Sequence, residues 1–206
     1  MRNPFFARLL TRCGARNEQR GNADLRREML AGLSGRVVEV GPGTGLNFPH
    51  YPDTVAELLA VEPEVYLRER AGEAAAAAPV TVRVVDGTAE RIPADDASVD
   101  AVALSGLLCS VPDQAAALAE FRRVLRPGGE LRFYEHVRSR ASAFAAYQDA
   151  MDAVWPRIMG GCRPNRDTYT AIKDAGFHIV YCRGFIFPPS ARLSVVSPRI
   201  IGAARV

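Results

Sequence analysis

A carboxylate and three glycines lie together in the run Glu39–Gly45, which reads Glu-Val-Gly-Pro-Gly-Thr-Gly. Glycines in such a turn let the backbone approach a ligand closely and adopt φ angles that other residues avoid. Glu62 ends the next apolar run of the chain. An acidic side chain at that point can accept hydrogen bonds from both hydroxyls of an unphosphorylated ribose. Together the two features predict a site for a ligand that carries adenosine.

The glycine spacing separates two classes of adenosine cofactor. Dinucleotide-binding enzymes use Gly-x-Gly-x-x-Gly, with a pyrophosphate on the N-terminus of the following helix. Here the third glycine, Gly45, comes one residue early and is followed by Leu46. Glu39 would place an anion beside a pyrophosphate, whereas it suits the sulfonium and amino groups of S-adenosylmethionine (SAM). We therefore expect SAM as the cofactor and S-adenosylhomocysteine as its product, and we disfavour an NAD-dependent oxidoreductase.

A second acidic turn, Asp86–Ala89 (Asp-Gly-Thr-Ala), follows the third apolar run. It falls at the carboxyl edge of the predicted sheet, where open α/β sheets bind ligands. Asp86 can there accept a hydrogen bond from an adenine amino group. The alternative is an ordinary turn, because Asp-Gly is a common turn dipeptide. Its position in the series favours the cofactor.

The elements that must position these residues alternate between strand and helix. Strands are predicted for five apolar runs, at residues 37–40, 58–61, 80–85, 99–104 and 130–134. Helices are predicted for residues 48–55, 64–77 and 113–125, the last with Asp113 as its cap. This alternation predicts a parallel sheet with helices on both faces. The tail is expected to contain a helix at 143–158 and two strands, 177–185 and 200–206, that pair antiparallel.

From Gly35 to Val137 the chain resembles the class I SAM-dependent methyltransferases. The match runs through Glu39–Gly45, Glu62, Asp86–Ala89, Asp95–Asp100 and Leu125–Gly129. The resemblance implies an α/β fold with a Rossmann-like, seven-stranded, mostly parallel sheet and an antiparallel last strand. It also implies that the three glycines pass under the methionine part, that Glu62 holds the ribose, and that Asp86 and Ala89 flank the adenine. The residues expected at the cofactor are Glu39, Gly41, Pro42, Gly43, Thr44, Gly45, Asn47, Glu62, Pro63, Asp86, Gly87, Thr88, Ala89, Ser105 and Leu107.

A narrower resemblance links the chain to animal methyltransferase-like proteins that methylate alkyl thiols. It is carried by Leu108–Val111, Arg123–Gly129, Glu135–Val137, Gln148, Trp155, Gly161-Cys162, Arg166 and Pro198–Gly202. Those relatives carry an N-terminal membrane anchor, which we do not expect in this sequence, and bacterial relatives include enzymes that cap thiols of dithiol natural products. The resemblance implies S-methylation of a small thiol or dithiol, from secondary metabolism or a xenobiotic. The alternatives are O- or C-methylation of a small secondary metabolite, and a non-catalytic cofactor-binding partner protein.

His136 is the candidate general base. It ends the fifth predicted strand, where catalytic side chains of this fold face the acceptor, and its usual pKa near 6.5 suits proton transfer. Glu135 precedes it, and because neighbouring side chains of a strand point to opposite faces, one of the two should point away. The alternative for His136 is a structural histidine bonded to a helix end. The residues expected to contact the acceptor are Cys109, Tyr147, Trp155 and Arg166.

Composition limits the other functions. The net charge of +3 is too small to imply a nucleic-acid partner, so a small-molecule acceptor is expected. The four cysteines form no Cys-x-x-Cys pair, which predicts neither a metal site nor a disulfide framework. No apolar run approaches the roughly 18 residues of a membrane span, and the N-terminus lacks a signal sequence, so we expect a cytoplasmic protein.

The 206 residues are expected to form a single methyltransferase domain with three parts. Residues 1–30 are predicted to be a helical lid whose arginines form a basic stripe; the alternatives are a solvent-facing helix and a membrane-surface contact. Residues 35–137 are predicted to form the cofactor-binding core. Residues 138–206 would supply the acceptor-side helix and the terminal hairpin. The sequence sets neither the identity of the acceptor nor the oligomeric state.

Overall fold

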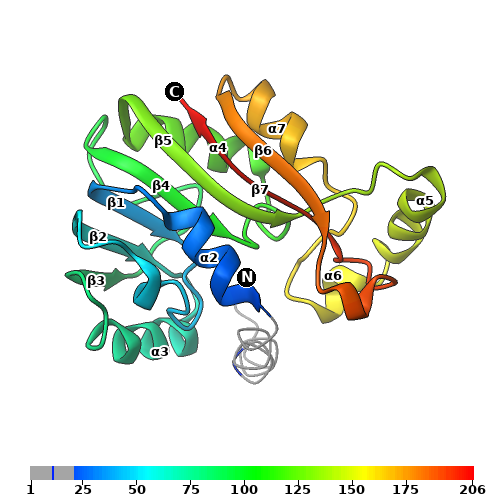
Figure 1. The fold of residues 1–206 in the computed structure, drawn as a ribbon, viewed down its shortest axis with the longest axis horizontal. Coiled ribbons are helices and arrows are strands. Elements are labelled where there is room, and N and C mark those ends of the chain that lie inside the picture. The colour runs from blue at the N-terminus through cyan, green and yellow to red at the C-terminus, as the bar shows by residue number, and fades with distance from the viewer. Residues whose placement is uncertain (1–10, 12–20) are drawn as a thin grey trace.

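Seven strands form one sheet in the order β3-β2-β1-β4-β5-β7-β6 in the computed structural model, which describes Thr11 and residues 21–206 (Figure 1). The strands are β1 (Gly35–Val40), β2 (Val55–Val61), β3 (Val82–Val85), β4 (Val99–Ser105), β5 (Leu125–His136), β6 (His178–Ile186) and β7 (Pro198–Arg205). β1 to β5 pair in parallel, while β7 runs antiparallel to both β5 and β6. The predicted fold class, with its antiparallel last strand, is confirmed.

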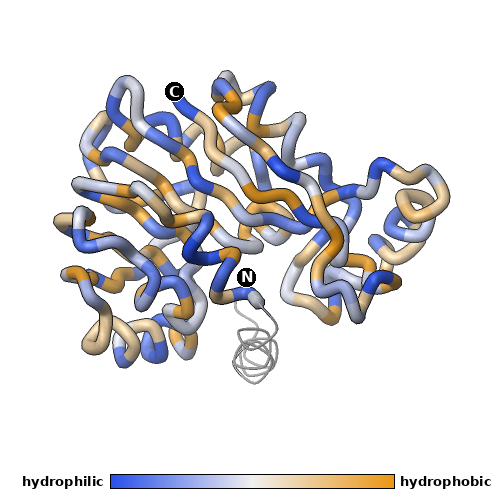
Figure 2. The backbone as a smooth tube through the Cα atoms, in the orientation of Figure 1, coloured by the Kyte–Doolittle hydropathy of each residue, from blue (hydrophilic) through white to orange (hydrophobic). Residues whose placement is uncertain are grey.

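Among the described residues, four helices pack on the two faces of this sheet: α2 (Ala23–Leu30), α3 (Val65–Ala75), α4 (Gln114–Val124) and α7 (Thr168–Asp174). Two more, α5 (Ser142–Met151) and α6 (Trp155–Ile158), lie beyond the end of the sheet (Figure 1). Apolar side chains of α2 and α3 lie against one face, and those of α4 and α7 contribute to the core on the other. Strand residues alternate between the two, so that Val38 and Val40 join the second core and Val37 the first. Figure 2 shows the apolar residues gathered along the strands.

Acidic side chains cap three of the helices. Asp113 accepts hydrogen bonds from the backbone N–H groups of Ala115 and Ala116, at 2.9 and 3.0 Å, as its place before α4 predicted. Glu64 caps α3 and Asp167 caps α7 in the same way. Such caps satisfy N–H groups that have no partner within the helix. They fix where each helix starts after its loop.

The structure corrects two of the predicted helices and adds a third helix. Residues 48–55 were expected to be a helix but contain one 3-10 turn, η2 (Phe48–His50), before β2 begins at Val55. The helix predicted at 143–158 is two helices, α5 and α6, because Pro156 fits the first turn of a new helix but not the interior of a continuing one. The short helix α7 was not predicted.

Residues 1–20 of the predicted helical lid lie outside the described residues, apart from Thr11. Of the predicted lid, the described part is the segment that contains α2, which crosses one face of the sheet (Figure 1). Within the described part of the chain, none of the helices combines the length and apolarity needed to span a bilayer.

The strand register brings the chemically interesting loops to one edge. Val40 at the end of β1 pairs with Val61 of β2 and with Leu104 of β4. Val61 pairs in turn with Val85 of β3, and Leu104 with Phe133 of β5. The residues that follow these strand ends therefore stand in one row along the carboxyl edge of the sheet. That row contains both predicted acidic turns and the end of β5.

Candidate active site

The glycine-rich turn after β1 favours glycine at three of its positions. Gly41, Gly43 and Gly45 have φ angles of 67°, 60° and 80°, in the left-handed region that favours glycine. A Cβ on Gly41 would lie 2.8 Å from Cδ1 of Leu107, and one on Gly45 would lie 2.7 Å from the ring of Phe48. The turn is thus packed tightly against the loop after β4 on one side and against η2 on the other.

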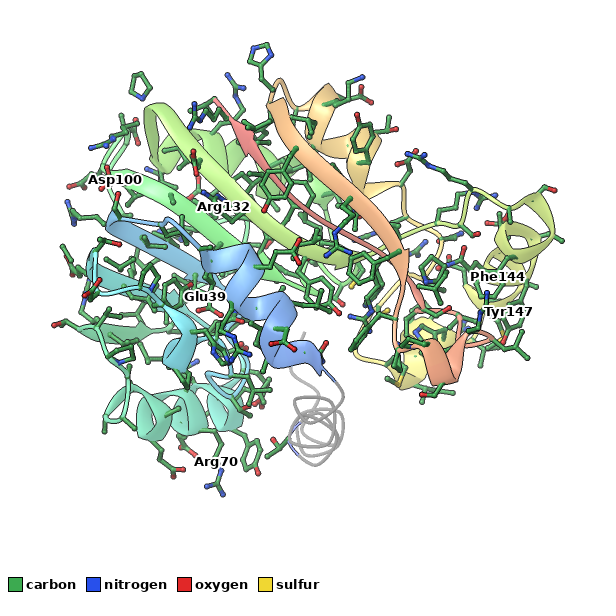
Figure 3. The ribbon with its side chains drawn as sticks, in the orientation of Figure 1. Glu39, Arg70, Asp100, Arg132, Phe144 and Tyr147 are labelled. Carbon is green, nitrogen blue, oxygen red and sulfur yellow. The ribbon has the colours of Figure 1, made fainter. Side chains whose placement is uncertain are left out.

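Glu39 is buried in β1, two residues before the first glycine of this turn (Figure 3). Its carboxylate accepts hydrogen bonds from Nδ2 of Asn47 at 2.7 Å and from the hydroxyl of Tyr51 at 2.9 Å. Burial raises the pKa of Glu39 to about 7, and the two hydrogen bonds oppose that rise. A carboxyl group in this state ionises readily when a cation binds beside it. Tyr51 was missed in the sequence because it falls in the segment expected to be helical.

Glu62 and Asp86 stand next in the row. The carboxylate of Glu62 is almost fully buried and accepts the backbone N–H groups of Gly43 and Glu64, each at 3.1 Å, so it links the turns that follow β1 and β2. Burial raises the pKa of Glu62. Asp86 is exposed and forms an ion pair of 2.9 Å with Arg68. The two carboxylates therefore differ: Glu62 lies inside the turn system, and Asp86 lies at its rim.

The remaining residues expected at the cofactor lie in the same loops. Pro42, Thr44 and Asn47 belong to the segment between β1 and η2, and Pro63 follows Glu62. A Cβ on Gly87 would lie 2.7 Å from Cγ1 of Val61, so the turn after β3 also approaches its neighbour closely. The other members of the set are Thr88, which bridges to Arg91, Ala89, which is buried, and Ser105 and Leu107, at the end of β4.

Glu135 and His136 at the end of β5 have different surroundings, as their alternation predicts. Glu135 is fully buried, and its carboxylate accepts backbone N–H groups of the loop after β4, from Leu107 (2.7 Å), Leu108 (3.2 Å) and Cys109 (3.4 Å). Burial raises the pKa of Glu135. His136 is half-buried and faces two sulfur atoms. Glu135 therefore shapes the loop after β4, while His136 is the residue of the pair that contacts nucleophilic groups.

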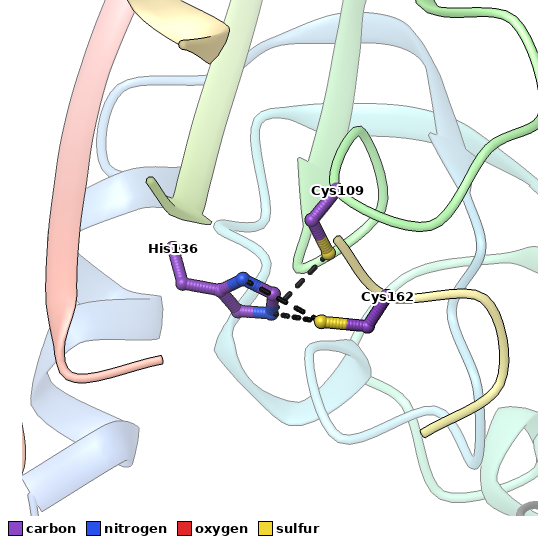
Figure 4. Close-up of side chains that lie close together, drawn as sticks. All are labelled: Cys109, His136 and Cys162. Atoms are coloured by element: carbon purple, nitrogen blue, oxygen red, sulfur yellow. Dashed lines mark hydrogen bonds between the residues drawn. The ribbon is translucent and has the colours of Figure 1, made fainter. Parts of the chain in front are cut away.

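Cys109, His136 and Cys162 meet in what we call the sulfur cluster (Figure 4). Nε2 of His136 lies 3.2 Å from Sγ of Cys109 and 3.7 Å from Sγ of Cys162. Trp155 donates its indole N–H to Sγ of Cys162 at 3.3 Å. Hydrogen bonding from Cys109 and His136 lowers the pKa of Cys162, whereas burial raises that of Cys109. Sequence spacing could not predict this cluster, because its members come from three separate segments.

The other residues expected at the acceptor are placed differently. Arg166 directs Nη1 to the backbone carbonyls of Leu108 (2.6 Å) and Val111 (2.7 Å), so its guanidinium holds the loop that carries Cys109. Tyr147 is 44% exposed on α5 and packs edge-on against Phe144, away from the sheet (Figure 3). Trp155 lies at the sulfur cluster through its bond to Cys162.

Gln148 is a structural residue that sequence reasoning did not assign to the site. It is fully buried on α5, and its Nε2 contacts the carbonyls of Val137 (3.1 Å), Pro164 (2.9 Å) and Val195 (2.8 Å). Its Oε1 accepts the N–H of Ser139 at 2.7 Å. One side chain thereby fastens α5 to the segment after β5, to the segment after Cys162 and to the loop before β7.

The turn after β1 fits SAM better than a dinucleotide. Its buried carboxyl group, Glu39, ionises near neutral pH and so matches a cation, whereas a pyrophosphate beside it would be repelled. The close contacts at Gly41 and Gly45 exclude any side chain at these two positions of the turn. The fold and this turn define the chain as a SAM-dependent methyltransferase.

Comparison with known proteins agrees. Residues 38–133 match the family described as a methyltransferase domain. The human thiol S-methyltransferase TMT1B is 34% identical over 182 residues, which are 85% of this chain and 73% of the human protein. The mouse TMT1B is 33% identical over 210 residues, with 98% of this chain and 84% of the mouse protein covered. A SAM-dependent methyltransferase from Thermotoga maritima shares the fold, with a TM-score of 0.69 and 23% identity over 97% of both chains. The chain belongs to the thiol S-methyltransferase family.

Proposed function

We propose that this enzyme transfers the methyl group of SAM to the sulfur of a small thiol, which enters beside the sulfur cluster. The observation that carries the proposal is the contact of His136 with two cysteine sulfurs at the end of β5, in the same row of loops as the glycine-rich turn. The thiol S-methyltransferases cover most of this chain, the sulfur cluster included, which supports the same acceptor.

The cofactor side is assigned to the turns after β1, β2 and β3, within a core of residues 35–137. SAM, when bound, supplies the electrophilic methyl group. Glu39 faces its cationic part from below the turn, Glu62 accepts from its ribose hydroxyls, and the turn at Asp86–Ala89 borders its adenine. For Glu62 to take this role, its oxygens must accept the ribose hydroxyls in addition to the backbone N–H groups of Gly43 and Glu64, which a carboxylate with several acceptor positions can do.

The acceptor side is assigned to residues 138–206 together with the loop after β4. A thiol has a pKa near 8.5, so a modest shift produces the thiolate at neutral pH. We assign the ionisation of the acceptor thiol to His136 together with Cys109 and Cys162, whose sulfur atoms it contacts. Trp155 borders the same cluster through its hydrogen bond to Cys162. Arg166 and Gln148 do not contact the acceptor in this account; they hold the loops that surround it.

The test is methyl transfer from labelled SAM to a panel of alkyl thiols, dithiols and catechols. The proposal predicts label in the thioether products, identified by mass spectrometry, and none on catechol oxygens. SAM binding measured by calorimetry is the control for a folded cofactor site. Transfer to catechols alone would contradict the proposal and indicate O-methylation, and SAM binding with no transfer to any thiol would favour a non-catalytic binding protein.

A further inference from the structure

The sulfur cluster has the donor set of a metal centre. It presents two thiols and one imidazole whose ligand atoms all lie within 4.8 Å of one another. Zinc is bound in proteins by cysteine sulfur at about 2.3 Å and histidine nitrogen at about 2.0 Å, usually in a tetrahedron. Those bond lengths require a sulfur-to-nitrogen separation of about 3.5 Å. The two separations from Nε2 of His136, 3.2 and 3.7 Å, lie on either side of that value.

The residues around the cluster hold these donors in place. The loop with Cys109 is fixed by the carboxylate of Glu135 and by the N–H of Arg163, which donates to the carbonyl of Cys109 at 2.8 Å. Ser110 Oγ lies 3.2 Å from Sγ of Cys109, and Trp155 donates to Sγ of Cys162. Hydroxyl and indole N–H groups stabilise thiolate ligands in this position, as outer-shell partners of metal sites do. Cys109 and Cys162 are both buried, which keeps competing ligands away.

We propose that Cys109, His136 and Cys162 bind a zinc ion whose fourth position is open to the sulfur of the acceptor thiol. This inference rests on the proposed function and deepens it. Three protein ligands with one free position are typical of catalytic zinc, whereas structural zinc takes four. Soft sulfur ligands with an imidazole favour zinc over magnesium or calcium. Two thiolates and a neutral imidazole also balance the charge of the ion.

The cluster then activates the acceptor by coordination. The thiol takes the fourth position and gives its proton to solvent. A lone pair of the acceptor sulfur forms the bond to the methyl carbon, while the bond from that carbon to the sulfonium sulfur breaks and its electron pair stays on S-adenosylhomocysteine. The neutral thioether binds the ion weakly and leaves. In this arrangement His136 is a ligand, and solvent accepts the proton.

The experiment measures metal content in the full-length protein, purified under reducing conditions and dialysed against zinc. The inference predicts about one zinc per chain, by mass spectrometry of the metal, and thiolate-to-metal charge-transfer bands after replacement by Co²⁺. Cys162→Ser and His136→Gln each remove a ligand, so each should weaken zinc binding by more than the roughly tenfold that loss of an outer-shell partner costs. Cys182→Ser, which removes a cysteine outside the cluster, is the matched control and should bind zinc like the unmodified chain.

Chelation separates this inference from the proposed function without any variant. Removing the metal should abolish transfer to thiols while SAM affinity, measured by calorimetry, is unchanged, and added zinc should restore transfer. Transfer at full rate in metal-free protein would overturn the zinc site and leave thiol methylation standing, with His136 as the base. Failure to bind zinc with both thiols reduced would also overturn it, as would loss of zinc in Cys182→Ser alone.

Discussion

The hydroxyl of Tyr51 donates a 2.9 Å hydrogen bond to the buried carboxylate of Glu39, below the glycine-rich turn. The two side chains lie twelve residues apart and come from β1 and from the residue that follows η2. Nη1 of Arg26 reaches Oδ1 of Asn47 at 2.5 Å, and its charge lowers the pKa of Glu39, but burial outweighs this and raises that pKa to about 7. The turn therefore contains a negative group that is only partly ionised before the cofactor arrives.

The first prediction concerns the pH dependence of SAM binding. The positively charged part of SAM favours the ionised form of Glu39, so SAM affinity should rise as pH increases from about 5.5 to about 7.5. Below the pKa of Glu39 the rise should be close to tenfold per pH unit. Calorimetry in buffers of different ionisation enthalpy should detect release of a proton. In Glu39→Gln the affinity should fall roughly 30-fold at neutral pH, about 2 kcal/mol, and become independent of pH over this range. An unchanged pH profile in that variant would show that another group is responsible.

The second prediction concerns stability without cofactor. Since the pKa of Glu39 is higher in the folded chain than in the unfolded one, the stability from this group is complete below about pH 4.5 and is lost as pH rises through about 7. Glu39→Gln has no charge to bury, so its free energy of unfolding should exceed that of the unmodified chain by about 2–3 kcal/mol near pH 8.5. At pH 5 the two should agree closely. Urea unfolding at both pH values checks this, and a less stable variant at pH 8.5 would refute it.

The third prediction concerns the buried amide of Gln148. Gln148→Leu keeps a similar volume but leaves the carbonyls of Pro164 and Val195 without their donor. Each buried carbonyl that loses its partner costs about 1–3 kcal/mol, so the free energy of unfolding should fall by about 3 kcal/mol. Tyr147→Leu, the adjacent and partly exposed position on α5, is the control and should change it by less than about 1 kcal/mol. Equal losses in the free energy of unfolding from the two substitutions would show that the hydrogen bonds of the Gln148 amide do not stabilise the fold.

The fourth prediction separates the acceptor side from the cofactor side. Arg166→Lys removes the planar group that bonds the carbonyls of Leu108 and Val111, which lengthens the tether of the loop carrying Cys109. We expect kcat/KM for a thiol to fall about tenfold, since small displacements near reacting groups reduce rates strongly. The Kd for SAM should not change. A weaker SAM affinity with an unchanged kcat/KM for the thiol would show that Arg166 acts on the cofactor side and not on the acceptor side.

The fold was largely predictable because strands and glycine-rich turns are local patterns. Five apolar runs ending at turns, with helical segments between them, identified the parallel core, and the hairpin signal of the tail identified the antiparallel end. The helix predicted at 143–158 failed because Pro156 starts a new helix there. The cofactor side was also visible in the sequence, since Glu39, Glu62 and Asp86 each stand at the end of a strand.

The acceptor side was not predictable in the same way. Cys109 and Cys162 lie 3.2 and 3.7 Å from one imidazole nitrogen, but they come from the loop after β4 and from the segment after α6. The backbone around Cys162 is held by tertiary bonds: the N–H of Arg163 donates to the carbonyl of Cys109, and Gln148 donates to the carbonyl of Pro164. Such contacts depend on tertiary packing, and cysteine spacing along the chain contains no signal for them. Spacing predicted no metal site, whereas the structure gathers three donor groups.

Sulfur is the acceptor atom of the proposed methyl transfer. The most direct measurement compares an alkyl thiol with the alcohol of the same carbon skeleton as acceptors, at saturating SAM, with kcat/KM for each obtained from the amount of methylated product. The account predicts a thioether from the thiol and no measurable ether from the alcohol. Equal or faster methylation of the alcohol would contradict it.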